Sequence, residues 1–392
     1  MSKILDYIAE ETGGKPYKSH RFCYDAEVKL PSLAYDESQE FTIRKDRYGE
    51  TDDTQKTTKN LSAAVKMFRK EKPLFTYFLD GSRRIYKVDD IEYSKRLFPV
   101  VGGQIGVACC QRNAPDSFGK AILESHLVLS LPSFAVAGQK HSTQFLGRLT
   151  KQINETERLK RLNIKFDEIL TYSSDKADKD SKEYLDRGTA TIQDKMIECE
   201  KKVVAELVKK NLLHQDSYLI KDGSLQYSKT AAGDYRELAV YQSNYRRVVG
   251  VSKSFNPEFS TDNRGQSNAA RIANLPLYRR TPAAMYIPLE DNKRIGKSRF
   301  SIWYVRIREA RYSESPFAGV LKLEKVLTTE EEIENGLDSG EVDRITANVI
   351  NERNPVCYGK DQRWANHLYP IYLTETYIKS KFLSDLHFIN LF

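Results

Sequence analysis

The tripeptide Asp-Gly-Ser occurs twice in this chain, beginning at Asp80 and at Asp222, and each copy follows an apolar run. The runs, residues 74–79 and 217–221, are typical of buried strands. An Asp at the carboxyl end of a strand projects into the crevice at the sheet edge, and a following Gly lets backbone or phosphate approach closely. One copy alone would usually be an ordinary turn. Two copies, each after an apolar strand, predict a shared site.

The helix expected over residues 191–210 supplies a third carboxylate. Glu200 lies four residues after Met196, on the apolar stripe that faces the sheet, whereas Glu206 has mainly lysines as helical neighbours. A buried carboxylate needs a cation, so Glu200 is either a metal ligand or the partner of a salt bridge to Lys221. If the helix is rotated relative to this interpretation, Glu206 completes the site instead.

Three carboxylates from two strands and one helix can bind two divalent ions about 4 Å apart, which activate water and stabilise the leaving oxygen of a phosphodiester. Oxygen ligands favour Mn²⁺ or Mg²⁺. Lys253 follows another apolar strand and could neutralise charge on the reacting phosphate, although alone it is an ordinary surface lysine.

Apolar periodicity predicts an α/β chain in which strands and helices form a mixed sheet flanked by helices. We expect strands at 74–79, 84–93, 97–111, 127–131, 164–171, 217–221, 247–251, 300–307 and 319–326. We expect helices at 4–11, 61–68 and 191–210, a capped one after Thr329 and a last one after Tyr369. Residues 1–70 form an N-terminal cap and residues 71–392 the main domain. The glycine-rich stretch 101–106 lacks P-loop spacing and predicts a strand bend, so we expect no ATPase activity in this chain.

The composition, with 40% hydrophobic and 30% charged residues, is that of a folded protein. The chain shows no apolar run long enough to span a bilayer and no signal peptide, which predicts a soluble, cytoplasmic protein without membrane contact. Its five cysteines include no C-x-x-C pair, and its six histidines lack the spacing of a helical zinc site. A zinc enzyme is therefore not expected.

The positive charge is concentrated in residues 246–311, which contain 14 Lys or Arg against 5 Asp or Glu, while the whole chain carries a net charge of +8. Aromatic residues are interleaved with these cations, as in surfaces that bind phosphates and stack bases; they are Tyr245, Phe255, Tyr278 and Tyr304. The alternative is an ordinary solvated surface. The candidate nucleic-acid-binding residues are Arg83, Arg246, Arg247, Arg264, Arg271 and Arg306.

The order of these parts resembles the NurA nucleases. The matching pieces are residues 78–82, the Glu-bearing helix before 219–225, then 250–254, 303–306 and 369–376. The resemblance implies an RNase H-like fold related to Piwi domains and Mn²⁺-dependent DNA exonuclease and endonuclease activity. It also implies a homodimer, to which the N-terminal cap would contribute, and a hexameric HerA-type ATPase partner that feeds DNA into the dimer.

One metal ligand departs from the family pattern. The family usually carries His or Asp in the helix after the Tyr-Pro motif, and the aligned position here is closest to Tyr377. Glu375 is a possible replacement, because it shares a helical face with Ile371 and Ile378. His367 is a second candidate.

The first hypothesis is thus a metal-dependent deoxyribonuclease that acts with a motor ATPase in DNA end processing or anti-phage defence. The metal ligands would be Asp80, Glu200, Asp222 and Glu375, with Lys253 as a further catalytic residue. The alternative is a catalytically inactive, RNase H-like nucleic-acid-binding subunit of the same complex. A guide-using Piwi-like protein is disfavoured because no guide-end pocket is recognisable.

Overall fold

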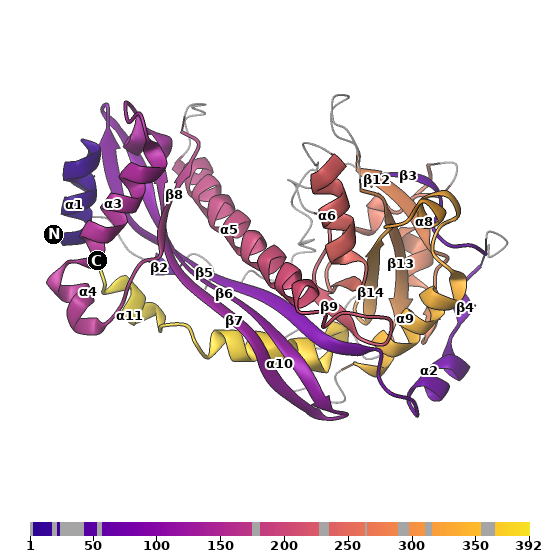
Figure 1. The fold of residues 1–392 in the computed structure, drawn as a ribbon. Coiled ribbons are helices and arrows are strands. Elements are labelled where there is room, and N and C mark those ends of the chain that lie inside the picture. Colours follow the sequence, from indigo (N-terminus) through magenta and orange to yellow (C-terminus); the bar gives the residue numbers. More distant parts are fainter. Residues whose placement is uncertain are drawn as a thin grey trace.

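A computed structural model describes residues 3–17, 22–23, 43–52, 57–174, 181–226, 235–262, 265–288, 298–309, 316–353 and 365–392. Its strands join into one mixed sheet that runs through the molecule from end to end (Figure 1). The predicted α/β class, with a mixed sheet flanked by helices, is confirmed.

Five neighbouring strands form the centre of the sheet, in the order β7-β6-β5-β9-β10. Their bounds are Ser117–Pro132, Arg96–Ala114, Phe75–Tyr93, Tyr218–Asp222 and Val248–Ser252. The first three are an antiparallel meander, β9 is parallel to β5, and β10 is parallel to β9. This combination of a meander with two parallel strands is consistent with an RNase H-like fold.

The other strands extend the sheet on both sides. On the β10 side follow β14 (Val320–Val326), β13 (Phe300–Arg306), β12 (Ala284–Pro288) and β3 (Ile43–Tyr48), and on the β7 side β8 (Glu168–Tyr172). Four short strands lie off this path: β1 (Lys15–Tyr17) and β2 (Phe22–Cys23) on β5, β11 (Arg279–Arg280) on β13, and β4 (Lys59–Asn60) on β11. Residues before position 70 therefore join the sheet at several places.

Strand β5 does not end where the sequence suggested. It continues through Asp80, Gly81 and Ser82 for 19 residues, and each of these positions pairs with β6. The prediction of a strand end at Asp80, with separate strands at 74–79 and 84–93, was wrong because pairing with a long neighbour overrides a turn-like local sequence. By contrast, β9 does end at Asp222, as predicted.

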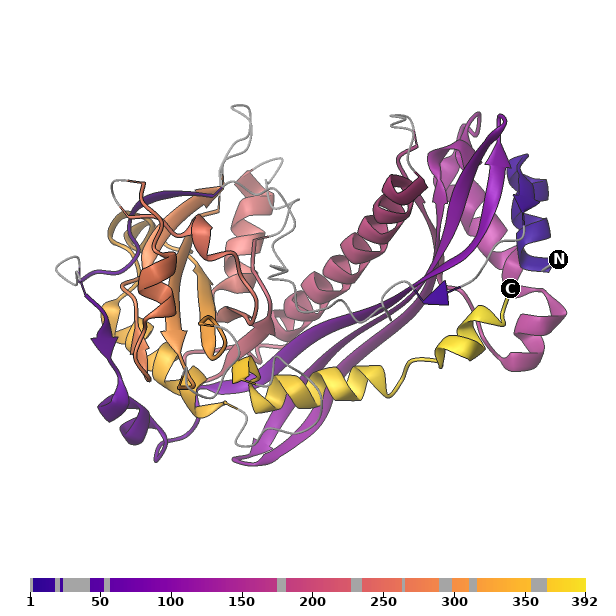
Figure 2. The ribbon, with the colours of Figure 1, turned by 180° about the vertical axis from the view of Figure 1, so that it is seen from behind.

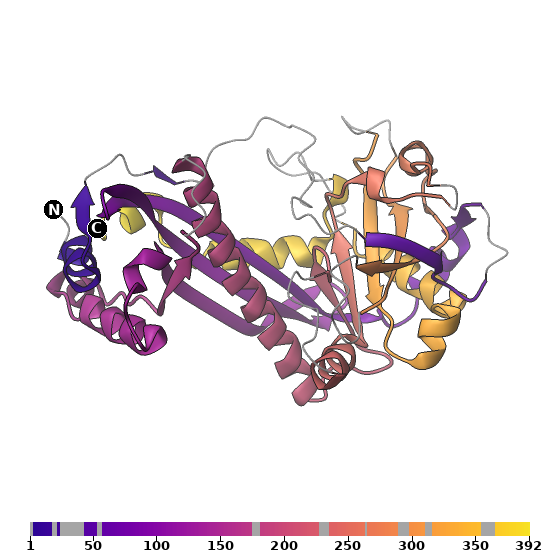
Figure 3. The ribbon, with the colours of Figure 1, turned by 90° about the horizontal axis from the view of Figure 1, so that it is seen from above.

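Two helices cover opposite faces of the meander (Figures 1 and 3). Helix α5 (Ser181–Lys209) is longer than predicted and lies on one face, and α10 (Tyr369–Lys379) lies on the other. Two glycines of β6 show that the helices contact opposite faces of this strand. A Cβ on Gly103 would lie 2.8 Å from Ile192 of α5, and one on Gly106 would lie 2.3 Å from Ile378 of α10. The glycine-rich stretch is thus a place of close helix approach within a continuous strand.

The remaining helices pack around the two ends of the sheet (Figure 2). They are α1 (Lys3–Thr12), α2 (Ser62–Phe68), α3 (Ser142–Asn154), α4 (Glu157–Leu162), α6 (Tyr235–Tyr245), α7 (Ala269–Ala273), α8 (Glu330–Asn335), α9 (Ser339–Asn351) and α11 (Asp385–Ile389). The predicted cap of α8 is confirmed, since Thr329 and Glu332 form a reciprocal capping box. None of the described helices is both long and apolar enough to cross a bilayer.

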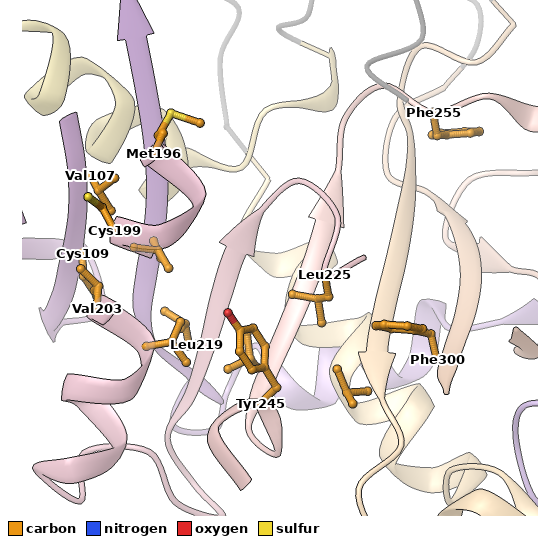
Figure 4. Packing of buried hydrophobic residues seen from close by; sticks show 14 of the residues in the cluster. Val107, Cys109, Met196, Cys199, Val203, Leu219, Leu225, Tyr245, Phe255 and Phe300 are labelled. Carbon is orange, nitrogen blue, oxygen red and sulfur yellow. The ribbon is translucent and has the colours of Figure 1, made fainter. Parts of the chain in front are cut away.

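Within the described ranges, the buried apolar residues form three clusters. One lies between α5 and the sheet and continues beneath β13, as Figure 4 shows from close by. Another fills the end of the molecule where both termini lie (Figure 1). The long strands of the meander connect these regions, so the central part of β5 and the end of β9 sit on a well-supported sheet.

Candidate active site

Asp80 and Asp222 come together because β5 and β9 are parallel neighbours. Leu79 pairs with Lys221, so each Asp lies one residue beyond that pair and on the same side of the sheet. Asp80 is buried, with 4% of its surface exposed. The structure therefore joins the two Asp-Gly-Ser motifs at one place, as predicted, although only Asp222 stands at a strand end.

The turn after Asp222 is fixed by backbone geometry and by a buried carboxylate. Gly223 has a φ of +83°, which favours glycine, and its N–H donates to the Val251 carbonyl at 2.8 Å. Glu324, fully buried on β14, accepts hydrogen bonds from the Ser224 hydroxyl at 2.9 Å and the Leu225 N–H at 2.8 Å. Sequence reasoning missed Glu324, because its strand gave no sign of what it would face.

Lys253 lies directly after β10 and reaches two of the carboxylates. Its Nζ is 3.0 Å from Asp222 Oδ2 and 3.8 Å from Glu375 Oε2. The Lys253 carbonyl accepts a hydrogen bond of 2.6 Å from Asn366 Nδ2, which holds this segment in place. Lys253 is thus brought into the site as predicted, and Asn366 is a second positioning residue that the sequence did not reveal.

Of the three candidates for the fourth ligand, Glu375 is the one that faces the site. Its side chain is 14% exposed, and its charge acts on Asp80 as well as on Lys253. Tyr377 instead lies under the ammonium group of Lys381, and the ring of His367 packs against Tyr372. The α10 helix thus presents Glu375 on the face of the sheet that also carries Asp80.

Glu200 approaches from the other face of the sheet, on α5. Its Oε2 atom is 3.1 Å from Nζ of Lys221, which also donates to the Asp222 carbonyl at 2.6 Å. A Cβ on Gly81 would lie 2.5 Å from Glu200 Oε1, so the glycine after Asp80 makes room for this carboxylate. Glu206, in contrast, is 40% exposed and paired with Lys210. The predicted orientation of the helix is confirmed, together with the salt bridge to Lys221.

Burial and mutual repulsion oppose ionisation of these carboxyls. The pKa of Asp80 lies well above its usual value, chiefly through burial and then through the charge of Asp222, while Lys253 lowers it. Burial likewise raises the pKa of Glu200, against the attraction of Lys221. Such an excess of buried carboxylates over nearby cations is relieved when a divalent cation binds.

The donor set fits an oxygen-liganded divalent ion. The carboxylates of Asp80, Asp222 and Glu375 lie on one face of the sheet with the ammonium group of Lys253, and Glu200 lies on the other face with Lys221. In the part of the chain that the structure describes, no three of these carboxylates bring oxygens within 4.8 Å of one another. The lysines occupy positions next to these carboxylates, at 3.0 Å from Asp222 and 3.1 Å from Glu200.

The predicted nucleic-acid-binding arginines divide into exposed and internal ones. Arg246 and Arg271 are exposed, and Arg83 on β5 is half-buried. Arg247 is also half-buried and donates to the Tyr218 hydroxyl at 2.5 Å. Arg264 lies outside the described residues.

Arg306 was wrongly assigned to a DNA-binding surface. It is buried, and its guanidinium donates to four backbone carbonyls, those of Leu275, Ala318, Ala273 and Pro316. The aromatic part of the prediction was also wrong for Tyr245, Phe255 and Tyr304, which belong to the apolar core. Tyr278 alone of the four is partly exposed, and Arg353 lies over its ring. The composition of this segment showed that it is rich in cations but not which of them are buried.

Comparison with models of known protein families gives no match. Comparison with curated proteins gives none either. The function must therefore be argued from the geometry of the site.

Proposed function

We propose that this chain is a metal-dependent nuclease that hydrolyses the phosphodiester bonds of DNA. The observation that carries the proposal is the meeting of Asp80, Asp222 and Glu375 with Lys253 on one face of an RNase H-like sheet. Glu200 lies on the other face, against Gly81 of β5 and Lys221 of β9. Such a set of carboxylates has the ligand chemistry of Mn²⁺ or Mg²⁺.

Each residue has a definable part in this chemistry. Asp80, Asp222, Glu200 and Glu375 would hold two divalent ions, which supply an activated water and charge stabilisation of the leaving oxygen when bound. Lys253, released from its pair with Asp222, donates to the non-bridging oxygens of the phosphate as negative charge develops there. Exposed Arg246 and Arg271 contribute to DNA binding outside the site.

The direct experiment is a cleavage assay on labelled single-stranded and double-stranded DNA with Mn²⁺, Mg²⁺ or EDTA. Asp80→Asn and Asp222→Asn should each reduce cleavage by orders of magnitude while the protein stays folded, because each removes a charged ligand and keeps the side-chain shape. Circular dichroism and thermal unfolding check the fold. Cleavage at the wild-type rate in both variants would refute the site.

A non-catalytic nucleic-acid-binding subunit is the second candidate, and one observation favours it: both buried lysines already pair with carboxylates. The same assay separates the two functions. DNA binding without any cleavage, in each metal tested, would support the binding subunit and contradict the nuclease.

The proposed biological setting is DNA end processing or anti-phage defence, as a homodimer with a HerA-type hexameric ATPase. Support comes from the order of sequence motifs alone. Light scattering of the purified chain tests the dimer, and copurification with a hexameric ATPase from the same genome tests the partner. A strictly monomeric chain would contradict the proposed assembly.

A further inference from the structure

A second group of potential metal ligands lies away from the carboxylates of the proposed nuclease site. Glu124 and His126 are two residues apart on β7 and therefore point to the same face, toward α5, which carries Cys199. One donor atom from each residue lies within 4.8 Å of the other two, and His126 Nε2 is 3.4 Å from Glu124 Oε2. No other group of this kind occurs among the described residues.

The burial of the three side chains suits an ion that enters from solvent. Cys199 is fully buried within the apolar cluster under α5, where Figure 4 shows it beside Val107. Glu124 and His126 are 29% and 26% exposed. The site is thus closed on the thiol side and open on the carboxylate side.

The other nitrogen of His126 has a carboxylate of its own. His126 Nδ1 lies 3.9 Å from Asp167 Oδ2, an oxygen that accepts a hydrogen bond of 2.8 Å from the Leu127 N–H. The Leu127 amide thus holds the Asp167 carboxylate in place. The imidazole has one nitrogen toward Asp167 and the other toward Glu124. Histidines that bind metals usually have this arrangement, in which a carboxylate orients the ring from behind.

The surroundings favour a cation at this position. The carboxylates of Glu124 and Asp167 lie near the two nitrogens of the His126 ring, at 3.4 and 3.9 Å. Lys195 lies near Cys199 as well, but its Nζ is 2.6 Å from Glu168 Oε2, so this charge is balanced by another carboxylate. A bound metal ion would take the place of the Cys199 thiol proton, which would pass to solvent.

We propose that Glu124, His126 and Cys199 bind a Zn²⁺ ion, with Asp167 orienting the imidazole and water in the fourth position. A thiolate, an imidazole and a carboxylate form the ligand set that Zn²⁺ prefers, whereas Mg²⁺ and Mn²⁺ prefer oxygen alone. The ion would join α5 to β7 at the residue next to Glu200. It would thereby fix the rotation of the helix that presents Glu200 to the proposed nuclease site.

The test uses the full-length chain, stripped of metal with a chelator and titrated with Co²⁺ and then Zn²⁺. Co²⁺ bound to a thiolate gives a charge-transfer absorption, so the wild type should show this band, and Zn²⁺ should remove it by competition. Cys199→Ser should abolish the band, and Cys109→Ser, which changes another buried thiol, should retain it. Asp167→Asn should weaken Zn²⁺ binding by about 10- to 100-fold.

Two further variants keep the test decisive if Cys199→Ser does not fold. Glu124→Gln and His126→Gln change partly exposed side chains, and each should weaken Zn²⁺ binding and remove the rise in melting temperature that Zn²⁺ gives the wild type. Asp222→Asn should leave the Co²⁺ band intact, which distinguishes this site from the proposed nuclease site. No thiolate band in the wild type, or an unchanged band in Cys199→Ser, would overturn the proposal.

Discussion

Glu200 and Glu206 lie on one helix in opposite surroundings, which makes them a matched pair for the proposed chemistry. Glu200 is 4% exposed and bound to Lys221, whereas Glu206 is 40% exposed and bound to Lys210. The first lies against Gly81 of β5 and Lys221 of β9, where we propose that the ions bind. The second contributes a surface pair of the kind that adds little to stability.

We expect Glu200→Gln to reduce Mn²⁺-dependent cleavage by orders of magnitude, because it keeps the shape and removes the charge that the ions require. Glu206→Gln should leave cleavage unchanged. Single-turnover kinetics on labelled DNA measure both variants, and thermal unfolding checks their stability. Equal effects of the two substitutions would contradict the assignment of Glu200.

A substitution at Gly81 tests the placement of the Glu200 carboxylate without changing its charge. An added Cβ would lie 2.5 Å from Glu200 Oε1, in a strand whose backbone otherwise accepts alanine. Gly81→Ala should therefore displace Glu200 and lower cleavage roughly tenfold or more, since small misplacements of catalytic groups are costly. The matched control is Gly147→Ala, because Gly147 lies in α3 with open space around it and alanine favours the helix by up to about 1 kcal/mol. A Gly81→Ala variant with full activity would show that Glu200 need not hold this position.

At the scale of elements, a buried ion pair fastens the hairpin of β6 and β7 to the end of α9. Arg112 on β6 donates to both oxygens of Glu352 at 2.6 and 2.5 Å, and Glu352 is 8% exposed. Burial nevertheless raises the pKa of Glu352 from 4.5 to about 7, although Arg112 opposes the shift. The folded protein thus holds the proton more tightly than the unfolded chain does.

This shift predicts a loss of stability with rising pH. The stabilisation from a carboxyl with a raised pKa is complete below about pH 4.5 and disappears as pH rises through about 7. Between about pH 5 and pH 8 the wild type should lose roughly 2 kcal/mol of unfolding free energy relative to Glu352→Gln, which has no proton to release there. Denaturant unfolding at several pH values measures the difference. Parallel pH profiles for the two proteins would contradict it.

The elements also show which parts of the site the sequence could predict. Helical periodicity correctly predicted that Glu200 faces the sheet, and apolar strand patterns correctly placed Asp222 and Lys253 after strands. Both predictions depend only on residues close together in the sequence. The path of β5 through Asp80 could not be predicted, since it depends on pairing with β6 over nearly its whole length. The group of Glu124, His126 and Cys199 was missed for a similar reason: its residues belong to elements far apart in the sequence, without the short spacing of a familiar zinc motif.

At the scale of the whole molecule, the positive segment 246–311 is less of a surface than its composition suggests. Arg306 donates to backbone carbonyls, and Arg280 is fully buried between Glu50 and Asp343. Arg246 and Arg271 are exposed in this segment. They lie in the half of the molecule that contains β10 to β14, whereas α3 lies in the half with both termini (Figure 1).

We therefore expect DNA binding to depend on positive charge in the half of the molecule that contains β10 to β14, and not in the half with both termini. Replacing Arg246 and Arg271 together with Ala should weaken duplex binding and lower the slope of log K against log salt by up to about 1.8, since each phosphate contact accounts for about 0.9. The matched control replaces two exposed lysines near the other end, Lys140 and Lys151, with the same change in net charge. If binding responded only to net charge, the two double variants would behave alike. Fluorescence anisotropy in the presence of EDTA, over a range of salt concentrations, measures both slopes. Equal slopes would mean that DNA does not contact the region of Arg246 and Arg271.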